Sequence, residues 1–263
     1  MLIQAMRGVA SSLLAGALAA LATAQDGGPS GRVASIPEIM EARSVPPASR
    51  PDDRVDRTVA YGLTYADFDL MKAMAGVAHA VPVRLVPRPI LSRQRAAAGQ
   101  VLGTTSEFAN LAGLEVAQGR FLAVTDNARF ENCAVLGSTL AEALFPNDDP
   151  IGKEIKVGTD SFTVVGVVRP RLSPPGIDGA VVPDPLDQTA YLPLSTCKLR
   201  FGERFLSGDP LRTEENQLTR IVFEIRPEAD GAAVAAQARD DLRRAHPRGD
   251  VEVVAPRPSL AGR

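Results

Sequence analysis

The sequence predicts an α+β fold, with two βαβ-like halves separated in the chain by an inserted, mostly β subdomain. Three observations lead to this prediction. Apolar residues make up 45% of the 263 residues, enough to bury a core. Helix and strand patterns alternate over 58–130 and again over 202–255. The intervening residues 131–201 contain mainly strand patterns and a proline-rich loop.

The region before the first half is expected to be a flexible linker over 25–57. It is rich in Gly, Pro, Ser and Arg and lacks a sustained period, apart from a helical turn predicted at 37–43. The first clear helix follows Thr64, an N-cap residue with Asp67 at the capping-box position, and Gly76 is expected to end it. Its apolar face carries Tyr65, Phe68, Met71 and Met74.

Two strands and a short helix complete the first half. Val81, Val83 and Leu85 alternate with other residues, and Pro82 among them indicates an edge strand or a bulge. A second strand is predicted over 101–104. A short helix over 107–111 is expected to end at Gly113.

The stretch from Cys133 to Val168, CAVLGSTLAEALFPNDDPIGKEIKVGTDSFTVVGVV, has the most consistent local signals. A short apolar strand leads to Ser138, a good N-cap for a helix that Pro146 stops. Turn residues then precede a half-buried strand over 154–157 and a hairpin turn at 158–160. The last strand is apolar on both faces, which predicts a central position in its sheet.

The remaining elements are a long loop and a strand–helix–strand series. Five prolines over 169–188 predict a loop, and 199–216 has no clear pattern, so its Glu214–Glu215 pair is expected on a solvated face. The final strand, helix and strand are then followed by a tail over 256–263. The residues that predict this series are Ile221, Phe223 and Ile225, then Val234, Ala238 and Leu242, then Val251 to Val254.

These motifs resemble those of the periplasmic core domain of MacB-like and FtsX-like ABC transporter permeases. Members of that family typically carry VLG, a helix, LFP, DPIGK, a strand, a turn and FTVVGVV in this order, as this chain does. LTYADF over 63–68, TSEFANLAGLEVAQGRF over 105–121 and AYLPL over 190–194 extend the resemblance. It implies a core domain over 58–255, in which 58–130 and 202–255 form a porter-like subdomain and 131–201 a Sabre-like one.

The N-terminal residues 1–24 are expected to be a signal peptide. Arg7 precedes an Ala- and Leu-rich run, and Ala22-Thr23-Ala24 before Gln25 fits the cleavage rule, so cleavage is expected between Ala24 and Gln25. The alternative is an uncleaved membrane anchor, although the strictly apolar part is shorter than the roughly 20 residues of a spanning helix. A mature N-terminus at Gln25 in mass spectrometry would support cleavage, whereas an intact Met1 would support the anchor.

The two cysteines, Cys133 and Cys197, have two interpretations in an exported protein. They form a disulfide that closes a long loop and adds about 2 to 4 kcal/mol of stability, or they are buried free thiols that act as small apolar residues. Sequence does not supply the distance that decides between them.

Catalytic, cofactor and metal sites are not expected. His79 and His246 are far apart and lack ligands at metal-binding spacing, and His246 is expected at a helix C-terminus. The Gly152-Lys153 pair lacks the remaining residues of a phosphate-binding loop, and Asp148-Asp149 fits a turn better than a calcium loop. With 29 basic and 31 acidic residues and no Trp, nucleic-acid binding is not expected either.

The resemblance implies an exported, non-enzymatic interaction domain that faces the periplasm. The 263 residues contain no match to the family's C-terminal permease helices or its nucleotide-binding domain. We therefore expect docking to a MacB- or FtsX-type permease, its ATPase complex, a periplasmic adaptor or an exported substrate. The alternative is a membrane-anchored accessory subunit of an ABC transporter, facing the periplasm. A secreted hydrolase is a third hypothesis, disfavoured because the expected catalytic constellations are missing.

Overall fold

The structure is a computed structural model that describes residues 38–46, 57–93, 95–171, 185–206 and 212–258. The signal peptide, its cleavage point at Ala24 and Gln25, and residues 259–263 of the expected tail lie outside the described residues. The tail was expected to start at 256, but residues 256–258 belong to the last strand of the main sheet, because they pair with the strand over 38–44. The fold is α+β, as predicted. Its main element is a mixed sheet of twelve strands in the order β15-β1-β14-β3-β6-β11-β8-β10-β9-β4-β5, with β7 paired to β10.

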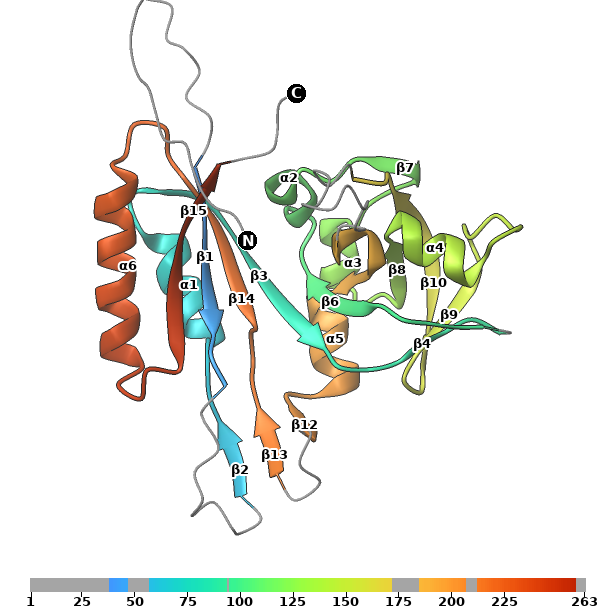
Figure 1. Ribbon diagram of the computed structural model, residues 1–263, viewed down its shortest axis with the longest axis horizontal. Coiled ribbons are helices and arrows are strands. Elements are labelled where there is room, and N and C mark those ends of the chain that lie inside the picture. The colour runs from blue at the N-terminus through green and yellow to red at the C-terminus, as the bar shows by residue number, and fades with distance from the viewer. Residues whose placement is uncertain (1–37, 47–56, 94, 172–184, 207–211, 259–263) are drawn as a thin grey trace, which may run out of the picture. The chain divides into compact units, whose positions relative to one another are not determined.

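The first part of this sheet is antiparallel and is covered on one face by two helices (Figure 1). The helices pack on Met40, Ala42, Ile221 and Phe223, which alternate along their strands and are almost fully buried. The strands are β1 (Glu38–Ser44), β3 (Val77–Val86), β14 (Arg220–Ile225) and β15 (Val251–Pro258), and the helices are α1 (Tyr65–Ala73) and α6 (Gly231–Ala245).

Strand β3 continues into the second part of the sheet because it changes partner along its length. It pairs with β14 over Val77 to Val83 and with β6 over Arg84 to Val86. Pro82, which has no N–H to donate, lies where β3 pairs with β14 alone. The remaining strands are β4 (Ile90–Leu91), β5 (Ala96–Ala97), β6 (Gln100–Thr104), β7 (Val116–Gly119), β8 (Cys133–Leu136), β9 (Glu154–Val157), β10 (Asp160–Val168) and β11 (Thr189–Pro193).

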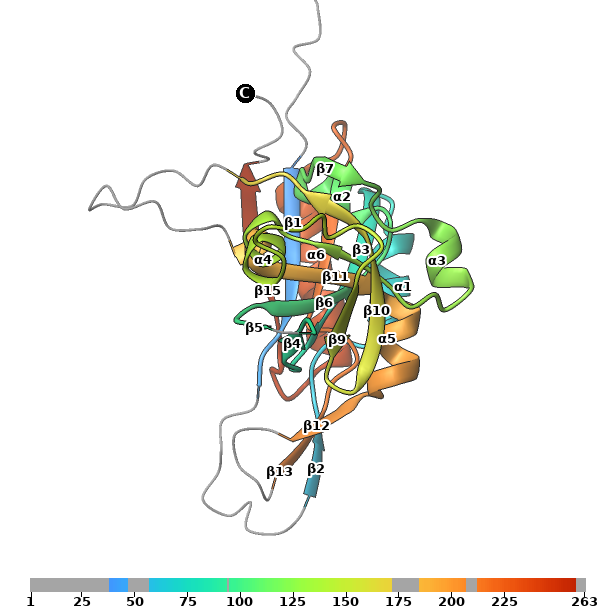
Figure 2. The ribbon, with the colours of Figure 1, turned by 90° about the vertical axis from the view of Figure 1, so that its right-hand side faces the viewer.

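Two hydrophobic clusters lie on opposite faces of this second part. On β8, Ala134 and Leu136 belong to one cluster, while Cys133 and Val135 belong to the other. Figure 2 shows α4 to one side of β10 and α3 to the other. The helices here are α2 (Phe108–Ala112), α3 (Val124–Ala128), α4 (Ser138–Leu144), α5 (Leu194–Phe201) and the 3₁₀ turn η1 (Pro185–Gln188). None of the helices in the described ranges is long and apolar enough to cross a membrane.

A separate sheet of three strands, in the order β12-β13-β2, lies below the main sheet in Figure 1. It consists of β2 (Arg57–Ala60), β12 (Arg204–Leu206) and β13 (Arg212–Glu215). Residues 199–216 have no clear sequence pattern, and the expectation that Glu214 is solvated is wrong. Glu214 is buried and accepts a hydrogen bond from the Tyr61 hydroxyl at 2.9 Å. This contact joins residues 153 positions apart, so local pattern could not predict it.

The structure confirms the capping box at the start of α1. The Thr64 hydroxyl accepts from the Asp67 amide, and the Asp67 carboxylate accepts from the Thr64 amide at 2.7 Å. The end of α2 is confirmed as well, because Gly113 has a φ of 63° and closes the helix in the left-handed conformation.

The start of α4 differs from the prediction, because Gly137 rather than Ser138 is the N-cap. The Gly137 amide donates to Thr189 O at 2.7 Å, and a Cβ at this position would lie 2.3 Å from the carbonyl oxygen of Asp187. Close packing against η1 therefore requires glycine here. Ser138 lies one residue inside the helix, and its buried Oγ has no hydrogen-bond partner within the described part of the chain.

The helical turn predicted at 37–43 is wrong, because residues 38–43 belong to strand β1, which lies between β14 and β15. Residues 38–44 of the expected linker are thus an internal strand of the main sheet. Two long-range partners determine this conformation, and the sequence around the segment contains neither. The rest of 25–57, apart from 45, 46 and 57, lies outside the described residues.

The predicted strand–helix–strand series at the end is present as β14, α6 and β15, although β1 separates the two strands. The expected inserted unit, 131–201, shares its sheet with β4 to β7 from the first half. We therefore interpret the inserted subdomain as starting soon after β3 rather than at 131.

Candidate functional site

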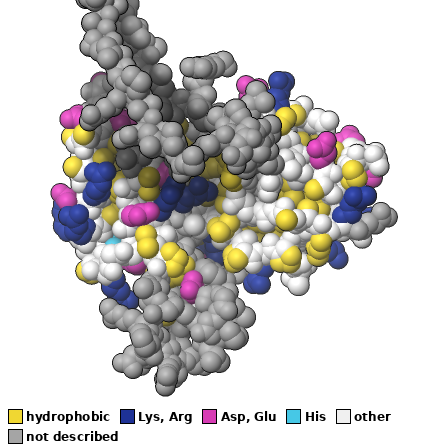
Figure 3. Space-filling model, in the orientation of Figure 1, with side chains coloured by type: hydrophobic (Ala, Val, Ile, Leu, Met, Phe, Trp, Pro, Cys, Tyr) yellow, Lys and Arg dark blue, Asp and Glu magenta, His cyan; other side chains and the backbone are white. Residues whose placement is uncertain are grey.

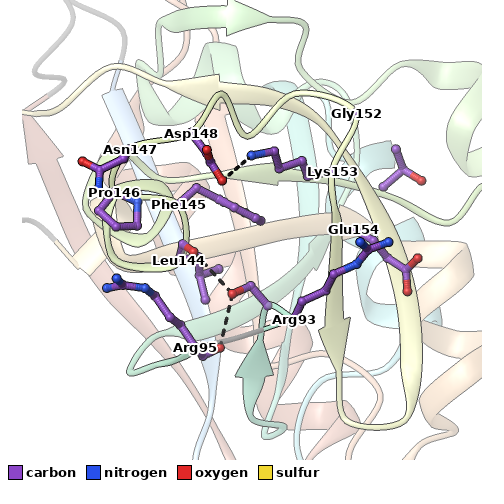
Figure 4. Close-up of a pocket in the computed structure, with 12 residues that line it drawn as sticks. Arg93, Arg95, Leu144, Phe145, Pro146, Asn147, Asp148, Gly152, Lys153 and Glu154 are labelled. Atoms are coloured by element: carbon purple, nitrogen blue, oxygen red, sulfur yellow. Dashed lines mark hydrogen bonds and ion pairs between the residues drawn. The ribbon is translucent and has the colours of Figure 1, made fainter.

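A polar groove lies at the end of the main sheet where the β4–β5 hairpin meets α4 and β9. It comprises two adjoining cavities of about 660 and 530 Å³, which share Ser92, Arg93, Arg95 and Glu154 as lining residues. We call this feature the hairpin groove. Lys153 and Asp148 line the first cavity, which Figure 4 shows, and Lys156 lines the second.

The turn between α4 and β9 places Lys153 on one wall of the groove. Asp149 Oδ1 accepts a hydrogen bond from the Ile151 amide at 3.0 Å, which confirms its predicted turn role. Gly152 has a φ of 76°, and its amide donates to Val164 O at 2.8 Å. The DPIGK motif is therefore a rigid turn that is hydrogen-bonded to β10.

The Lys153 ammonium group interacts with two neighbours on that wall. It lies 2.7 Å from a carboxylate oxygen of Asp148 and 5.5 Å from the centroid of the Phe145 ring. Both side chains of the ion pair are more than a third exposed, so the pair contributes little to stability. The ion pair matters for the site because it lies among the side chains that line the first cavity (Figure 4).

The opposite wall is the tip of the β4–β5 hairpin. The Ser92 amide donates to Arg95 O at 2.7 Å, and the Ser92 hydroxyl donates to Leu144 O at 3.3 Å. These bonds anchor the tip to the end of α4. The side chains of Arg93 and Arg95 are exposed, and their guanidinium groups have no ion pair or hydrogen bond among the residues that the structure describes. The groove thus presents unneutralised positive charge.

A separate cavity, of about 400 Å³, is lined by an ion pair between Arg120 and Asp126 of α3. Asp126 accepts two hydrogen bonds from Arg120, at 2.6 and 3.0 Å, and one from the Ala123 amide at 2.8 Å. Burial by itself would raise the pKa of Asp126, but these hydrogen bonds and the Arg120 charge lower the pKa below its usual range. Asp126 is therefore ionised at neutral pH.

We expect the Arg120–Asp126 pair to stabilise the fold only above the acidic range. Because the folded-state pKa of Asp126 is lowered, its contribution is present above the unfolded value of about 4 and is lost as pH falls through the folded value. Thermal melts of wild type and Asp126→Asn between pH 3 and 7 should differ at pH 7 and converge below about pH 4. A difference that stays constant across this range would contradict the prediction. Asp240→Asn, an exposed change on α6, serves as the control.

The two cysteines are free and buried, in different hydrophobic clusters. Cys133 faces one side of β8, whereas Cys197 on α5 packs over Gly103 on the other side of the sheet. The disulfide considered from the sequence is thus not part of this structure. Burial, and for Cys133 also the Asp126 charge, raises the pKa of each thiol to about 12. Both thiols are therefore protonated at neutral pH.

This arrangement predicts two unreactive thiols in the native protein. Protein prepared without reductant should react with less than one equivalent of Ellman's reagent when folded and with two equivalents in guanidinium chloride. Cys133→Ala and Cys197→Ala should each remove one equivalent under denaturing conditions. No reaction in denaturant would instead reveal the disulfide.

A third cluster surrounds His246, the C-cap of α6. Its Nε2 lies 3.0 Å from Asp67 Oδ2, and its Nδ1 lies 3.3 Å from Asp250 Oδ1. All three side chains are about nine-tenths buried. The sequence correctly predicted His246 at a helix end but missed this cluster, because Asp67 lies 179 positions away. The one feature of the sequence that indicates part of this cluster is the spacing of four residues between His246 and Asp250. His79, the other histidine, is exposed on β3 and is not part of this cluster.

A fourth polar cluster lies between α1 and α5. Arg84 is buried and donates to Gly202 O, and its charge acts on the neighbouring Tyr65 hydroxyl. The Lys198 ammonium group lies 4.2 Å from the centroid of the Tyr65 ring. Burial raises the pKa of Tyr65, so the phenol stays neutral. The cluster joins the two parts of the fold and does not line any of the cavities described above.

None of these clusters has the arrangement of a catalytic or metal centre. Among the described residues no group of three His, Cys, Asp or Glu side chains is placed to hold a metal ion. The His246 imidazole contacts a carboxylate on each side, and among the described residues it forms no ion pair or hydrogen bond with a nucleophilic side chain.

Comparison with known proteins identifies related domains. The model of the MacB-like periplasmic core domain family matches residues 4–241. "Macrolide export ATP-binding/permease protein MacB" of Marinobacter nauticus is 31% identical over 158 residues, which cover 59% of this chain and 23% of the relative. The protein of the same name from Azoarcus is 38% identical over 102 residues, covering 38% of this chain and 14% of the relative. The chain thus matches less than a quarter of the length of these relatives.

Solved structures show the same fold. The periplasmic region of MacB from Actinobacillus actinomycetemcomitans superposes with a TM-score of 0.61 at 18% identity, covering 82% of this chain and 88% of that one. The extracellular domain of the transporter YknZ from Gram-positive bacteria gives a TM-score of 0.59 at 17% identity, covering 82% and 99%. At these identities the likeness concerns the fold alone.

Proposed function

Because the chain belongs to the MacB-like periplasmic core domain family, we propose that it acts as a non-enzymatic docking domain of an ABC transporter system. The family match over 4–241 is the observation that supports this proposal, and it places the domain in the periplasm. In this function the domain binds another component of the transporter, either a MacB- or FtsX-type permease with its ATPase or a periplasmic adaptor.

The fold suits this role because rigid sheet elements carry its exposed polar features. The β4–β5 hairpin is bonded to α4, and the DPIGK turn is bonded to β10, so both walls of the hairpin groove are preorganised. Preorganised surfaces lose less conformational entropy on binding than mobile ones do. The inserted part of the fold therefore offers a docking surface that is formed before the partner arrives.

Crosslinking in the native cell envelope tests the proposed function. The full chain with an affinity tag is expressed at its natural level, crosslinked with a short amine-reactive reagent, and purified under denaturing conditions. Recovery of a MacB- or FtsX-type permease, its ATPase or a periplasmic adaptor, above the level found with an unrelated exported protein carrying the same tag, is the expected result. Repeated recovery of none of these components would refute the proposal.

A further inference from the structure

We infer that the hairpin groove binds an extended, carboxylate-rich peptide segment of the docking partner, an inference that rests on the docking function proposed above. Basic side chains outnumber acidic ones in the groove: Arg93, Arg95, Lys153 and Lys156 line it together with Asp148 and Glu154. One basic residue, Lys153, is neutralised by Asp148, whereas Arg93, Arg95 and Lys156 have no ion pair among the described residues. The uncompensated charge is positive, so the complementary partner is anionic.

The directions of the two arginines indicate an elongated ligand. Figure 4 shows that they diverge from the hairpin tip: Arg93 points toward Glu154, and Arg95 points toward the end of α4. A compact anion cannot contact both guanidinium groups, whereas an extended chain with several carboxylates can reach each in turn. Arg–carboxylate pairs are frequently bidentate, which favours carboxylate side chains as the contacting groups.

The shape and mixed charge of the groove favour a peptide over a membrane surface. The two adjoining cavities form a concavity, whereas a lipid headgroup layer requires a flat or convex basic surface. Figure 3 shows acidic side chains close to the basic ones at this end of the molecule. Asp148 and Glu154 inside the groove would repel a continuous anionic surface, but a peptide can place neutral residues opposite them.

The wall formed by α4 also supplies a second kind of contact. Phe145 and Pro146 line the first cavity beside Lys153, so apolar side chains of the peptide can pack there. The cation–π contact of Lys153 with Phe145 keeps its ammonium group over the cavity. A carboxylate of the peptide can then replace Asp148 as the partner of Lys153.

Fluorescence anisotropy with the full chain tests the inference, with a fluorescein-labelled Glu-Ser repeat peptide as the probe and a Lys-Ser repeat as the control peptide. We expect the Glu-Ser peptide to bind and the Lys-Ser peptide not to bind. The affinity for the Glu-Ser peptide should fall as the salt concentration rises. Arg93→Glu combined with Arg95→Glu should weaken binding about tenfold or more. Asp148→Asn should strengthen binding about two- to fivefold, because it removes a competing carboxylate from Lys153.

The matched control is Arg239→Glu with Arg248→Glu, two exposed arginines in and just beyond α6 that carry the same change in net charge. Equal loss of binding in both double variants would overturn the inference, because it would show a net-charge effect. No binding of the acidic peptide, or binding of phosphatidylglycerol vesicles in its place, would also overturn it.

Envelope crosslinking with the groove double variant separates this inference from the proposed function. If the wild-type chain recovers transport components but does not bind the acidic peptide, the docking function stands and the groove assignment fails. If no transport component is recovered even with wild type, the docking function fails. Loss of both peptide binding and crosslinking in the groove variant, but not in the control variant, supports both.

Discussion

Replacing Gly166 with alanine is expected to lower the free energy of unfolding by at least about 3 kcal/mol. Gly166 is the glycine of the FTVVGVV motif on β10, and it pairs with Gly119 on β7. A Cβ at Gly166 would lie 2.0 Å from the backbone carbonyl oxygen of Arg120. This oxygen cannot move aside as a flexible side chain can, because Arg120 N donates to Val165 O at 3.0 Å and holds the two segments together.

The expected result is therefore separation of β7 from β10 or loss of the fold. Urea unfolding followed by circular dichroism measures the effect, with Thr163→Ala as the control because the Thr163 side chain is exposed on the same strand. We expect the control to change stability by less than about 1 kcal/mol. If Gly166→Ala instead unfolds at the same urea concentration as the control, the close approach of Arg120 is not a constraint on the fold.

Replacing His246 with alanine is expected to cost about 2 to 3 kcal/mol, because it leaves two buried carboxylates without their shared partner. Asp67 retains its capping bonds to Thr64, but it loses the His246 contact at 3.0 Å. Asp250 retains its bond from the Gly62 amide at 2.8 Å. The cluster joins the start of α1, the end of α6 and the entry to β15, so its loss should loosen three elements together.

The matched control is His79→Ala, which removes an imidazole from an exposed position on β3 and should change stability by no more than about 0.5 kcal/mol. A double-mutant cycle with Asp67→Asn measures the coupling between the two side chains. Additive effects in that cycle, or equal effects of the two histidine changes, would contradict the structural role of His246.

Sequence was sufficient where a few neighbouring residues determine the conformation. Thr64 and Asp67 form the predicted capping box because the bonds close over three residues. The turn from Pro146 to Lys153 and the central strand β10 also agree with prediction, since prolines, turn residues and apolar alternation act locally. The α+β class and the family resemblance rest on such local signals.

Sequence was insufficient where the partner is distant in the chain. Residues 38–44 looked like linker and helical turn, yet they form a strand because β14 and β15 bond to both of its edges. Gly137 displaced Ser138 as the N-cap because Asp187 packs against it. The possible pairing of Cys133 with Cys197 depended on which face of the sheet each thiol occupies, which sequence does not report.

The sequence by itself therefore determined the class of fold, the family and the local geometry of the DPIGK turn. Only the tertiary structure decided that this turn, Arg93 and Arg95 of the hairpin, and α4 together line a basic groove. The physical reason is the range of the interactions involved. Capping and turn formation act over three or four residues, whereas the groove joins walls that are about fifty positions apart, as the bond from Ser92 to Leu144 shows.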